Sequence, residues 1–178
     1  MKGKRMFKRV QVKASRMVAD FFDWLKKSEL IELDKIDPLD DPVRPELTNQ
    51  FRTTIGRKIY GLKDEKGDIA AVMCFAFTNE IPTTVEELEL MSIDAHNQGI
   101  HRAGVGGNIA IAYTVWSTKR GGGKRIVKEV FKMIKKSNHL IRLVTLSPLT
   151  QMARDFHIRN GAKELQVNKE TQNFEYLI

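Results

Sequence analysis

The sequence predicts an α/β fold in which helices flank one mixed sheet, and three observations point to this class. Segments with the two-residue period of a strand alternate along the chain with segments of helical period. The segments 69–78 and 109–116 are apolar almost throughout, as strands covered on both faces are. The chain has 178 residues, of which 42% are hydrophobic, so it can bury a core, and we expect a single domain over 1–178.

The first half of the chain predicts a strand, a helix, an irregular insert and a hairpin. Apolar and polar residues alternate over 9–14, and Ser15 follows as a cap for a helix. Residues 34–50 hold three of the five prolines and many acids, so they predict a loop, or a short helix with a wrapped connection. Residues 58–63 and 69–78 predict a hairpin around the turn DEKGD, and the apolar second strand is expected in the middle of the sheet.

The second half predicts alternating strands and helices after one segment that is harder to assign. Within 79–108, TTVEELELM predicts a short helix and DAHNQGIHRAGVGG an exposed loop. The apolar strand 109–116 then precedes a glycine triplet and an amphipathic helix. The remaining expected elements are that helix over 124–136, a strand over 140–146 that Ser147-Pro148 ends, a helix from Thr150 to about Asn160 that Gly161 stops, and short strands at 164–168 and 173–178.

The charge of the chain favours a polyanionic partner. Lysine and arginine number 30 against 22 acids, a net charge of +8, and composition leaves nucleic acid, anionic lipid and a phosphorylated ligand open. No apolar run approaches the roughly 20 residues that span a bilayer, and no signal-peptide core follows the basic N-terminus. We therefore expect a cytoplasmic protein without a membrane partner.

The sequence offers no pattern for a metal site or a disulfide. Cys74 is the single cysteine, and its place in an apolar strand predicts an unreactive thiol. His96 and His101 are five positions apart in the expected loop, a spacing that fits no metal-binding motif. No metal cofactor is therefore expected.

The glycine triplet and its basic helix predict an anion site. Residues 119–136 carry eight basic residues and one acid. Lys124 and Arg125 stand in the first helical turn, where the partial positive charge of a helix N-terminus disfavours bases. Glycines let backbone amides approach an anion, and a helix N-terminus completes the cradle, so the turn Arg120–Arg125 predicts phosphate binding. The alternative is a solvated basic face in which the glycines form only a flexible turn.

Two common nucleotide motifs are excluded. A Walker loop requires glycine at position 118 and serine or threonine at position 125, where this chain has Thr118 and Arg125. A dinucleotide-binding fingerprint requires glycine at position 126, which is Ile126. ATP hydrolysis and dinucleotide chemistry are therefore not expected.

The strand 109–116, the glycine turn and the following helix together resemble the pyrophosphate-binding element of the GNAT (Gcn5-related N-acetyltransferase) superfamily. The unit 140–162 is also similar, since FHIRNG at 156–161 resembles the stretch where the family often has an aromatic pair before a glycine. The resemblance implies an α+β arrangement with a mixed, mostly antiparallel central sheet, and a domain that binds acyl-coenzyme A. The implied coenzyme A-binding residues are Val115, Trp116, Arg120, Gly121, Gly122, Gly123, Lys124, Arg125 and Asn160.

A closer resemblance is to the catalytic domain of malonyl-CoA decarboxylase, which is itself GNAT-like. It maps the family's catalytic serine onto Ser147 and its catalytic histidine onto His157. This chain departs from the family in the turn before the basic helix, which in the family is longer and contains a glutamate and here is TKRGGG. The similar segments are 124–129 (KRIVKE), 145–148 (TLSP) and 156–162 (FHIRNGA), with weaker similarity at 74–78 and 173–176.

The residues themselves leave the roles of Ser147 and His157 open. Ser147 follows a strand, at the edge where α/β sheets bind ligands, but a Ser-Pro turn that only ends the strand fits equally. A histidine titrates near neutral pH and can act as a general acid or base, and the alternative is a boundary histidine with its hydrogen bonds satisfied. We expect His157 to border a buried helix stripe formed by Met152, Ala153 and Phe156.

The aromatic residues of the apolar strand also have two interpretations. Tyr113 and Trp116 are expected to be core or sheet-face aromatics, and the alternative for Trp116 is a place in the lining of a substrate pocket.

Three functional hypotheses follow. The first is an acyltransferase that uses acetyl-CoA or a related acyl-CoA as cosubstrate, with a small-molecule or protein amine as acceptor and His157 as proton donor. The second is decarboxylation of malonyl-CoA by Ser147 and His157. The third is a GNAT-like scaffold without catalysis whose basic surface binds nucleic acid. The sequence predicts neither the acceptor nor the oligomeric state.

Overall fold

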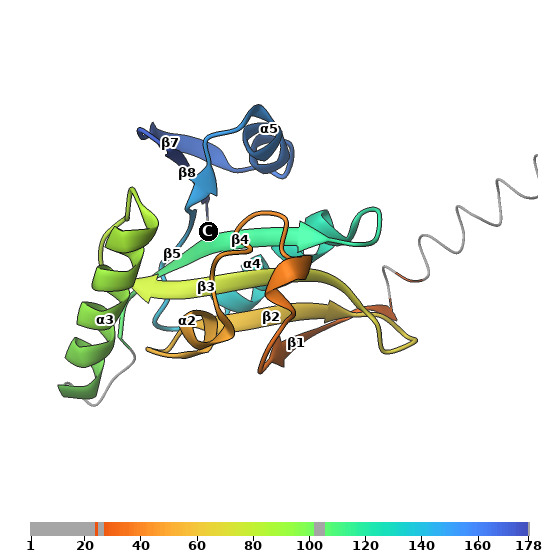
Figure 1. The fold of residues 1–178 in the computed structure, drawn as a ribbon, viewed down its shortest axis with the longest axis horizontal. Coiled ribbons are helices and arrows are strands. Elements are labelled where there is room, and N and C mark those ends of the chain that lie inside the picture. The colour runs from red at the N-terminus through yellow and green to blue at the C-terminus, as the bar shows by residue number, and fades with distance from the viewer. Residues whose placement is uncertain (1–23, 25–26, 102–105, 178) are drawn as a thin grey trace, which may run out of the picture.

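The protein is described from a computed structural model, which covers residues 24, 27–101 and 106–177 (Figure 1). The expected strand over 9–14, and the helix capped by Ser15 except for its residue 24, lie outside the described residues. No helix in this part of the chain is long and apolar enough to cross a membrane.

The described strands form one mixed sheet of eight strands, most of whose pairs are antiparallel, as predicted. Their order is β1-β2-β3-β4-β5-β8-β6, with β7 pairing on β8, and β4 and β5 are the parallel pair. The apolar strand β3 lies inside the sheet between β2 and β4, which confirms its central position. The strands are β1 (Glu29–Leu33), β2 (Lys58–Lys63), β3 (Ile69–Thr78), β4 (Ile109–Ser117), β5 (Arg142–Thr145), β6 (Ser147–Pro148), β7 (Lys163–Val167) and β8 (Thr171–Tyr176).

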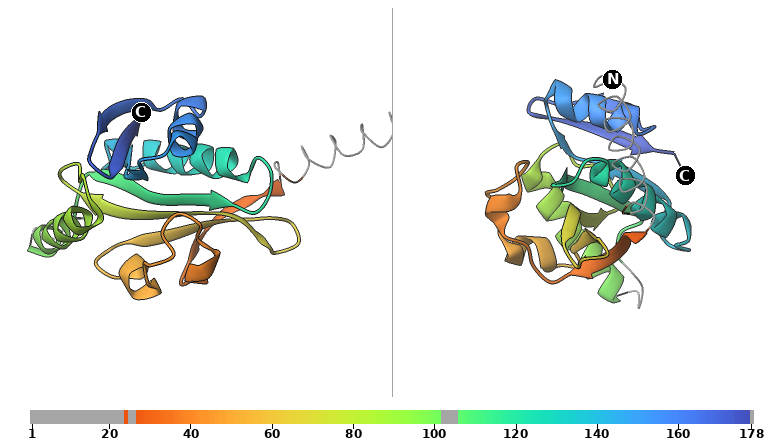
Figure 2. Two further views of the ribbon diagram at one scale, coloured as in Figure 1. Left: turned by 45° about the horizontal axis from the view of Figure 1, so that its top comes forward. Right: turned by 90° about the vertical axis from the view of Figure 1, so that its right-hand side faces the viewer.

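Helices cover both faces of the sheet. Figure 2 shows α4 over one face and the segment with η1 and α2 over the other. On the α4 side, Ile126 and Val130 pack against Phe75 of β3. On the opposite side, Leu88 of α3 packs into a second cluster that contains Ile59 of β2. The helices are η1 (Pro38–Asp40), α2 (Asn49–Thr53), α3 (Val85–His101), α4 (Gly122–Lys135) and α5 (Gln151–Arg159).

Local signals set several of these elements as predicted. The insert 34–50 contains the short helices η1 and the start of α2, within irregular chain. Thr150 caps α5, because its hydroxyl accepts a hydrogen bond of 3.2 Å from the Ala153 amide. Gly161 ends that helix with a φ of +90°, the left-handed conformation that glycine adopts without strain.

The prediction of an exposed loop after the TTVEELELM helix is wrong for the first half of that segment. Helix α3 continues through it to His101, so His96 lies on a helix. The continuation is stabilised on its buried side by Ser92 and Ala95, and on its surface by a bond of 2.6 Å from Gln98 to Asp94 one turn earlier. The small buried residues make a weak hydrophobic period, which is why the sequence pattern missed this helix.

Two boundaries also differ from the prediction. Helix α4 begins at Gly122, so two of the three glycines belong to its first turn. The strand expected over 140–146 is shorter, since β5 ends at Thr145. Ser147 and Pro148 then form a separate short strand, β6, that pairs with β8.

Candidate active site

The candidate site lies where β4 and β5 separate. The last hydrogen bond between the two strands runs from the Leu146 amide to the Ala112 carbonyl, at 2.9 Å. β4 continues to Ser117, and a cleft of about 440 Å³ opens between this extension and the chain that follows Leu146. The parallel pairing thus ends at the point where the cleft begins.

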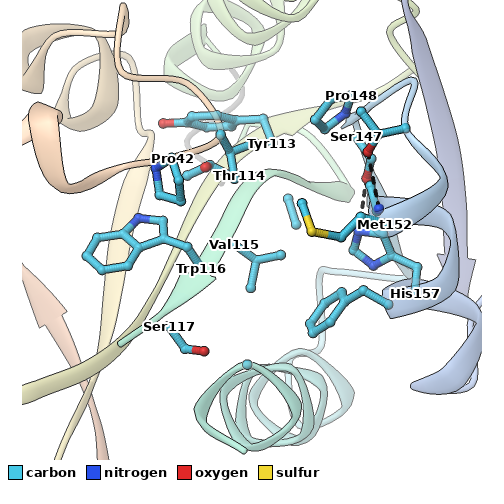
Figure 3. A pocket seen from close by; sticks show the side chains of 16 residues that line it. Pro42, Tyr113, Thr114, Val115, Trp116, Ser117, Ser147, Pro148, Met152 and His157 are labelled. Carbon is cyan, nitrogen blue, oxygen red and sulfur yellow. Dashed lines mark hydrogen bonds between the residues drawn. The ribbon is translucent and has the colours of Figure 1, made fainter. Parts of the chain in front are cut away.

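The lining of the cleft is mostly apolar. Figure 3 shows Val115 and Trp116 of β4 on one side, and Met152 and His157 of α5 on the other. Among the described residues that line the cleft, none is an acid, a lysine or an arginine. They are Pro42, Val43, Ala112, Tyr113, Thr114, Val115, Trp116, Ser117, Gly123, Ser147, Pro148, Thr150, Met152, Ala153, Phe156 and His157.

Ser147 and His157 meet in the wall of this cleft. Ser147 Oγ lies 2.9 Å from His157 Nε2 (Figure 3). It also lies 3.0 Å from Thr145 Oγ1, to which the serine donates. On the far side of the ring, His157 Nδ1 lies 2.9 Å from the Tyr176 hydroxyl. Because the Ser147 hydroxyl donates its hydrogen bond to Thr145, the imidazole donates Nε2–H to Ser147. The Tyr176 hydroxyl then donates to Nδ1, so that one chain of hydrogen bonds links all four side chains.

Burial keeps this imidazole neutral. His157 is 4% exposed, its ring stacks on Phe174 with centroids 5.1 Å apart, and burial lowers its pKa to about 4. Burial also raises the pKa of Tyr176, so its hydroxyl keeps its proton at neutral pH. The pair of Ser147 and His157 therefore starts as two neutral hydrogen-bonding groups.

Backbone conformation and close packing require glycine at the three positions of the triplet, at the base of the cleft. Gly121 precedes α4 with a φ of +82°. A Cβ at Gly122 would stand 3.0 Å from the Ala70 carbonyl of β3, and a Cβ at Gly123 would stand 3.0 Å from the Phe156 ring across the cleft. Because glycine has no Cβ at these two positions, the helix N-terminus can lie close to both the sheet and α5.

Backbone amides at this helix start are available to an anion. The first bond of the helix runs from the Arg125 amide to the Gly121 carbonyl, and the Gly122 amide donates to the Lys119 carbonyl, both at 3.0 Å. The amides of Gly123 and Lys124 precede the first helical hydrogen bond and have no acceptor within the helix. They form the part of the predicted phosphate cradle that the chain itself provides.

Several of the basic side chains near this turn are engaged elsewhere. Lys119 forms an ion pair with Asp64 in the β2–β3 turn, and this pairing lowers the pKa of the carboxyl group. Arg125 pairs with Glu129 at 3.2 Å, one turn along α4. Arg120 and Lys124 are exposed. The charge of the turn is therefore partly neutralised by acids of the same chain.

The predicted site residues fall into two groups. Val115, Trp116, Gly123, Ser147 and His157 line the cleft together. The second group, which does not line it, consists of Arg120, Gly121, Gly122, Lys124, Arg125 and Asn160.

Asn160 and Lys124 line a second hollow, of about 280 Å³, together with residues of α4 and the C-terminal end of β8. Asn160 ends α5, and its side-chain amide donates to the Phe156 carbonyl at 2.8 Å. The coenzyme A-binding roles given to these residues stay predictions.

The prediction of a buried stripe on α5 is wrong at its N-terminal residue, Met152. Met152 is 80% exposed, because it sits at the mouth of the cleft, and Ala153 and Phe156 are half-buried beside it. His157 is instead the buried residue of the helix, which the helical spacing alone did not reveal.

Sequence reasoning missed two members of the hydrogen-bonded chain. Thr145 of β5 bonds Ser147 and Tyr176 of β8 bonds His157, and no local pattern joins these strands. A signal existed for Tyr176, since residues 173–176 share the weaker resemblance to malonyl-CoA decarboxylase.

Outside the cleft, Cys74 is fully buried in β3, and burial raises the pKa of its thiol to about 11, as expected of an unreactive cysteine. Among the described residues, no group of three or more His, Cys, Asp or Glu side chains is placed to hold a metal ion.

Comparison with solved structures identifies the fold as GNAT-like. Malonyl-CoA decarboxylase from Cupriavidus metallidurans aligns with 89% of this chain at a TM-score of 0.60 and 16% identity. The GNAT-like decarboxylase GphF, in complex with isobutyryl-CoA, aligns with 84% of this chain and 98% of its own length, at a TM-score of 0.62 and 11% identity. A variant of the spermidine N-acetyltransferase SpeG of Vibrio cholerae gives 0.53 and 9%, over 85% of this chain and 94% of its own.

These likenesses establish the fold. The chain spans 64% of the length of the Cupriavidus decarboxylase, so it corresponds to a part of that protein. No protein-family model matches the sequence, and no curated protein does. The GNAT-like fold and the mixed, mostly antiparallel sheet predicted from the sequence are confirmed.

Proposed function

We propose that this chain binds an acyl-coenzyme A and removes carbon dioxide from a short β-carboxyl acyl group, malonyl in the simplest case. Ser147 and His157 are its catalytic residues in this proposal. The observation that carries it is the bond of 2.9 Å between Ser147 Oγ and His157 Nε2, both buried in the wall of an apolar cleft.

The shape of the cleft supports a thioester with a long arm. The extension of β4 from Thr114 to Ser117 offers backbone groups that β5 does not pair, and a pantetheine arm carries amides that can bond them. The free amides of Gly123 and Lys124 lie at the start of α4, where a pyrophosphate is favoured. The thioester would then stand near Ser147.

The chemistry of decarboxylation suits these surroundings. Loss of carbon dioxide from a malonyl thioester leaves an enolate, whose oxygen needs hydrogen-bond donors. The described lining of the cleft has no cationic side chain to stabilise the substrate carboxylate, while the Ser147 hydroxyl can donate to the enolate oxygen. The site thus favours the enolate over the carboxylate.

Proton delivery follows from the serine–histidine bond. The enolate beside His157 raises the pKa of its imidazole again, so the ring takes a proton from solvent once carbon dioxide has left. Ser147 then passes its proton to the enolate carbon and receives the one on Nε2, which returns the imidazole to its neutral form. One solvent proton is consumed, and carbon dioxide and the acetyl thioester are the products.

Acyl transfer to an amine acceptor is the second candidate. It is favoured by the turn TKRGGG, which lacks the glutamate of the decarboxylase-like turn. In this reaction His157 would protonate the departing thiolate. The described lining residues offer a cationic amine no carboxylate to bind, and for this reason we rank transfer second.

The test is turnover of malonyl-CoA, followed as acetyl-CoA by mass spectrometry. We expect Ser147→Ala and His157→Gln to lower kcat by about 10²–10⁴-fold, the usual contribution of general acid–base catalysis. His139→Gln is the matched control, because His139 bonds the Gly107 carbonyl away from the cleft. Absence of acetyl-CoA with the wild-type protein, or full activity of His157→Gln, would contradict decarboxylation.

A further inference from the structure

The cleft depends on a separation of two strands that should otherwise continue to pair. β4 and β5 are parallel neighbours over four residues each, and both then go on in extended conformation, one toward Ser117 and the other toward Ser147. After the bond from the Leu146 amide to Ala112, the next bond of a parallel ladder would run from the Thr114 amide to the Leu146 carbonyl. Tyr113, between Ala112 and Thr114, is left unpaired where the register between β3 and β4 shifts.

A single guanidinium binds the carbonyls of both Tyr113 and Leu146. Arg44 Nε donates to the Tyr113 carbonyl at 2.9 Å, and Arg44 Nη2 donates to the Leu146 carbonyl at 3.1 Å. Arg44 comes from the insert before α2, far from either strand in sequence, and the residue is 8% exposed. The guanidinium therefore stands where the next hydrogen bond between the strands would form.

Arg44 is itself held by a buried network. Asp41 accepts from the Arg44 amide at 3.2 Å, and its carboxylate pairs with Arg52 at 2.8 Å, with both side chains fully buried. Arg52 also donates to the Arg44 carbonyl at 2.7 Å. Thr114 of β4 donates to the same Asp41 carboxylate at 3.0 Å, so the network fixes the segment 41–44 against the strand that lines the cleft.

We propose that Arg44 is a positioning residue for the Ser147–His157 site, an inference that rests on the proposed function. The carbonyl of Leu146 belongs to the peptide group that continues into Ser147, so the bond from Arg44 fixes where the serine leaves the sheet. The bond to Tyr113 fixes β4 on the opposite side of the same gap. The guanidinium thereby sets both the width of the cleft and the place of Ser147 relative to His157.

The chemistry of the side chain accounts for the choice of arginine. A guanidinium is planar and presents several donors in a fixed fork, so it can hold two carbonyls at one separation. A lysine ammonium is a point charge on a flexible stem and can hold one of the carbonyls without setting the distance to the other. Arg44→Lys therefore keeps the charge and removes the fork.

The experiment compares Arg44→Lys and Arg44→Met with Arg57→Met. Arg57 is a matched control, since it is a second buried arginine on the same face of the sheet, where it bonds Ser92 and Thr54 and touches neither strand carbonyl. We expect both Arg44 variants to lower kcat for malonyl-CoA by about 10–100-fold with little change in KM, the cost of misplacing a reacting group by about an ångström. Arg57→Met lowers stability and leaves kcat unchanged.

A double-mutant comparison separates positioning from a general loss of structure. In a Ser147→Ala background, Arg44→Lys should lower the residual turnover little further, because the group that it positions is already absent. If Arg44→Lys has wild-type kcat, or if its full effect persists in the Ser147→Ala background, the proposal is wrong.

A second readout does not depend on activity. The ¹⁵N shifts of the two His157 ring nitrogens report their hydrogen bonds, and we expect them to change in Arg44→Lys and not in Arg57→Met. If malonyl-CoA is not turned over at all but these shifts respond to Arg44→Lys, the proposed function fails and the positioning role stands. Unchanged shifts in a folded Arg44→Lys protein would overturn it.

Discussion

At the scale of single residues, the burial of His157 determines what the candidate site can do. An exposed histidine would be partly charged near neutral pH, but here burial lowers the pKa to about 4 and the ring bonds two hydroxyl groups. A neutral ring between Ser147 and Tyr176 can relay a proton in either direction, and it becomes a proton donor only next to an anion. The site is therefore suited to substrates that bring or develop negative charge.

The same shift predicts how stability depends on pH. The pKa of His157 is lower in the folded chain than the usual 6.5, so the unfolded chain binds the proton first as the pH falls. The contribution of the neutral imidazole to the free energy of unfolding is complete above about pH 6.5 and is lost as the pH falls toward 4. We expect the free energy of unfolding to drop by about 2–3 kcal/mol from this group between pH 7 and pH 4.5.

The contribution of His157 is measured by urea unfolding of the wild type and His157→Gln at the two pH values. The variant should lose less stability on acidification than the wild type does. His139→Gln serves as the control and should follow the wild type. Equal losses in wild type and His157→Gln would show that the imidazole is not held neutral by the fold.

At the scale of elements, the start of α4 carries two glycines with different neighbours. A methyl group at Gly122 would press on the Ala70 carbonyl of β3, which cannot move without the sheet. A methyl group at Gly123 would press on the edge of the Phe156 ring, which is half-buried beside the cleft and can turn. One glycine therefore belongs to the packing of helix on sheet and the other to the cleft.

Replacing each by alanine should separate these roles. We expect Gly122→Ala to lower the free energy of unfolding by roughly 1–3 kcal/mol, the usual cost of overpacking. We expect Gly123→Ala to stay within about 1 kcal/mol of the wild type, because the helix propensity of alanine offsets the displaced ring. Thermal unfolding with and without coenzyme A should then show a smaller ligand-induced rise in Tm for Gly123→Ala. A wild-type ligand response in Gly123→Ala would place the ligand elsewhere.

At the scale of the whole molecule, the net charge of +8 is only partly free for a partner. Within residues 119–136, Lys119, Arg125 and Lys132 form ion pairs with acids of the same chain. The exposed remainder consists of Arg120 before α4 and of lysines spread along this helix to its C-terminal end, of which Lys124 stands in the first turn. Within the part of the chain that the structure describes, this distribution suits a ligand with a few phosphates better than a long polyanion, which would need a continuous basic surface.

The two kinds of partner can be compared directly. At about 0.15 M salt we expect coenzyme A to raise the Tm of the wild-type protein, and a mixed-sequence DNA duplex to leave it unchanged, because nonspecific phosphate contacts are strongly weakened by salt. Thermal unfolding with each ligand measures the difference. A rise with duplex DNA and none with coenzyme A would favour the nucleic-acid scaffold over either enzyme.

The sequence by itself determined the features that depend on neighbours along the chain. The strand and helix periods, the Thr150 cap and the left-handed glycine at 161 are local, and the structure confirms them. The resemblance at 145–148 and 156–162 also pointed to Ser147 and His157, which the fold brings to 2.9 Å. Helix α3 was missed in part because its buried residues are small and give little hydrophobic period.

Only the tertiary structure decided how the cleft is built. Arg44 meets carbonyls 69 and 102 residues further along the chain, and Tyr176 meets His157 across 19 residues from another strand. No period or cap in the sequence encodes such pairs, because they depend on how the sheet orders its strands and where two of them stop pairing. The sequence therefore indicated which residues carry the chemistry, and the fold decided which residues hold them in place.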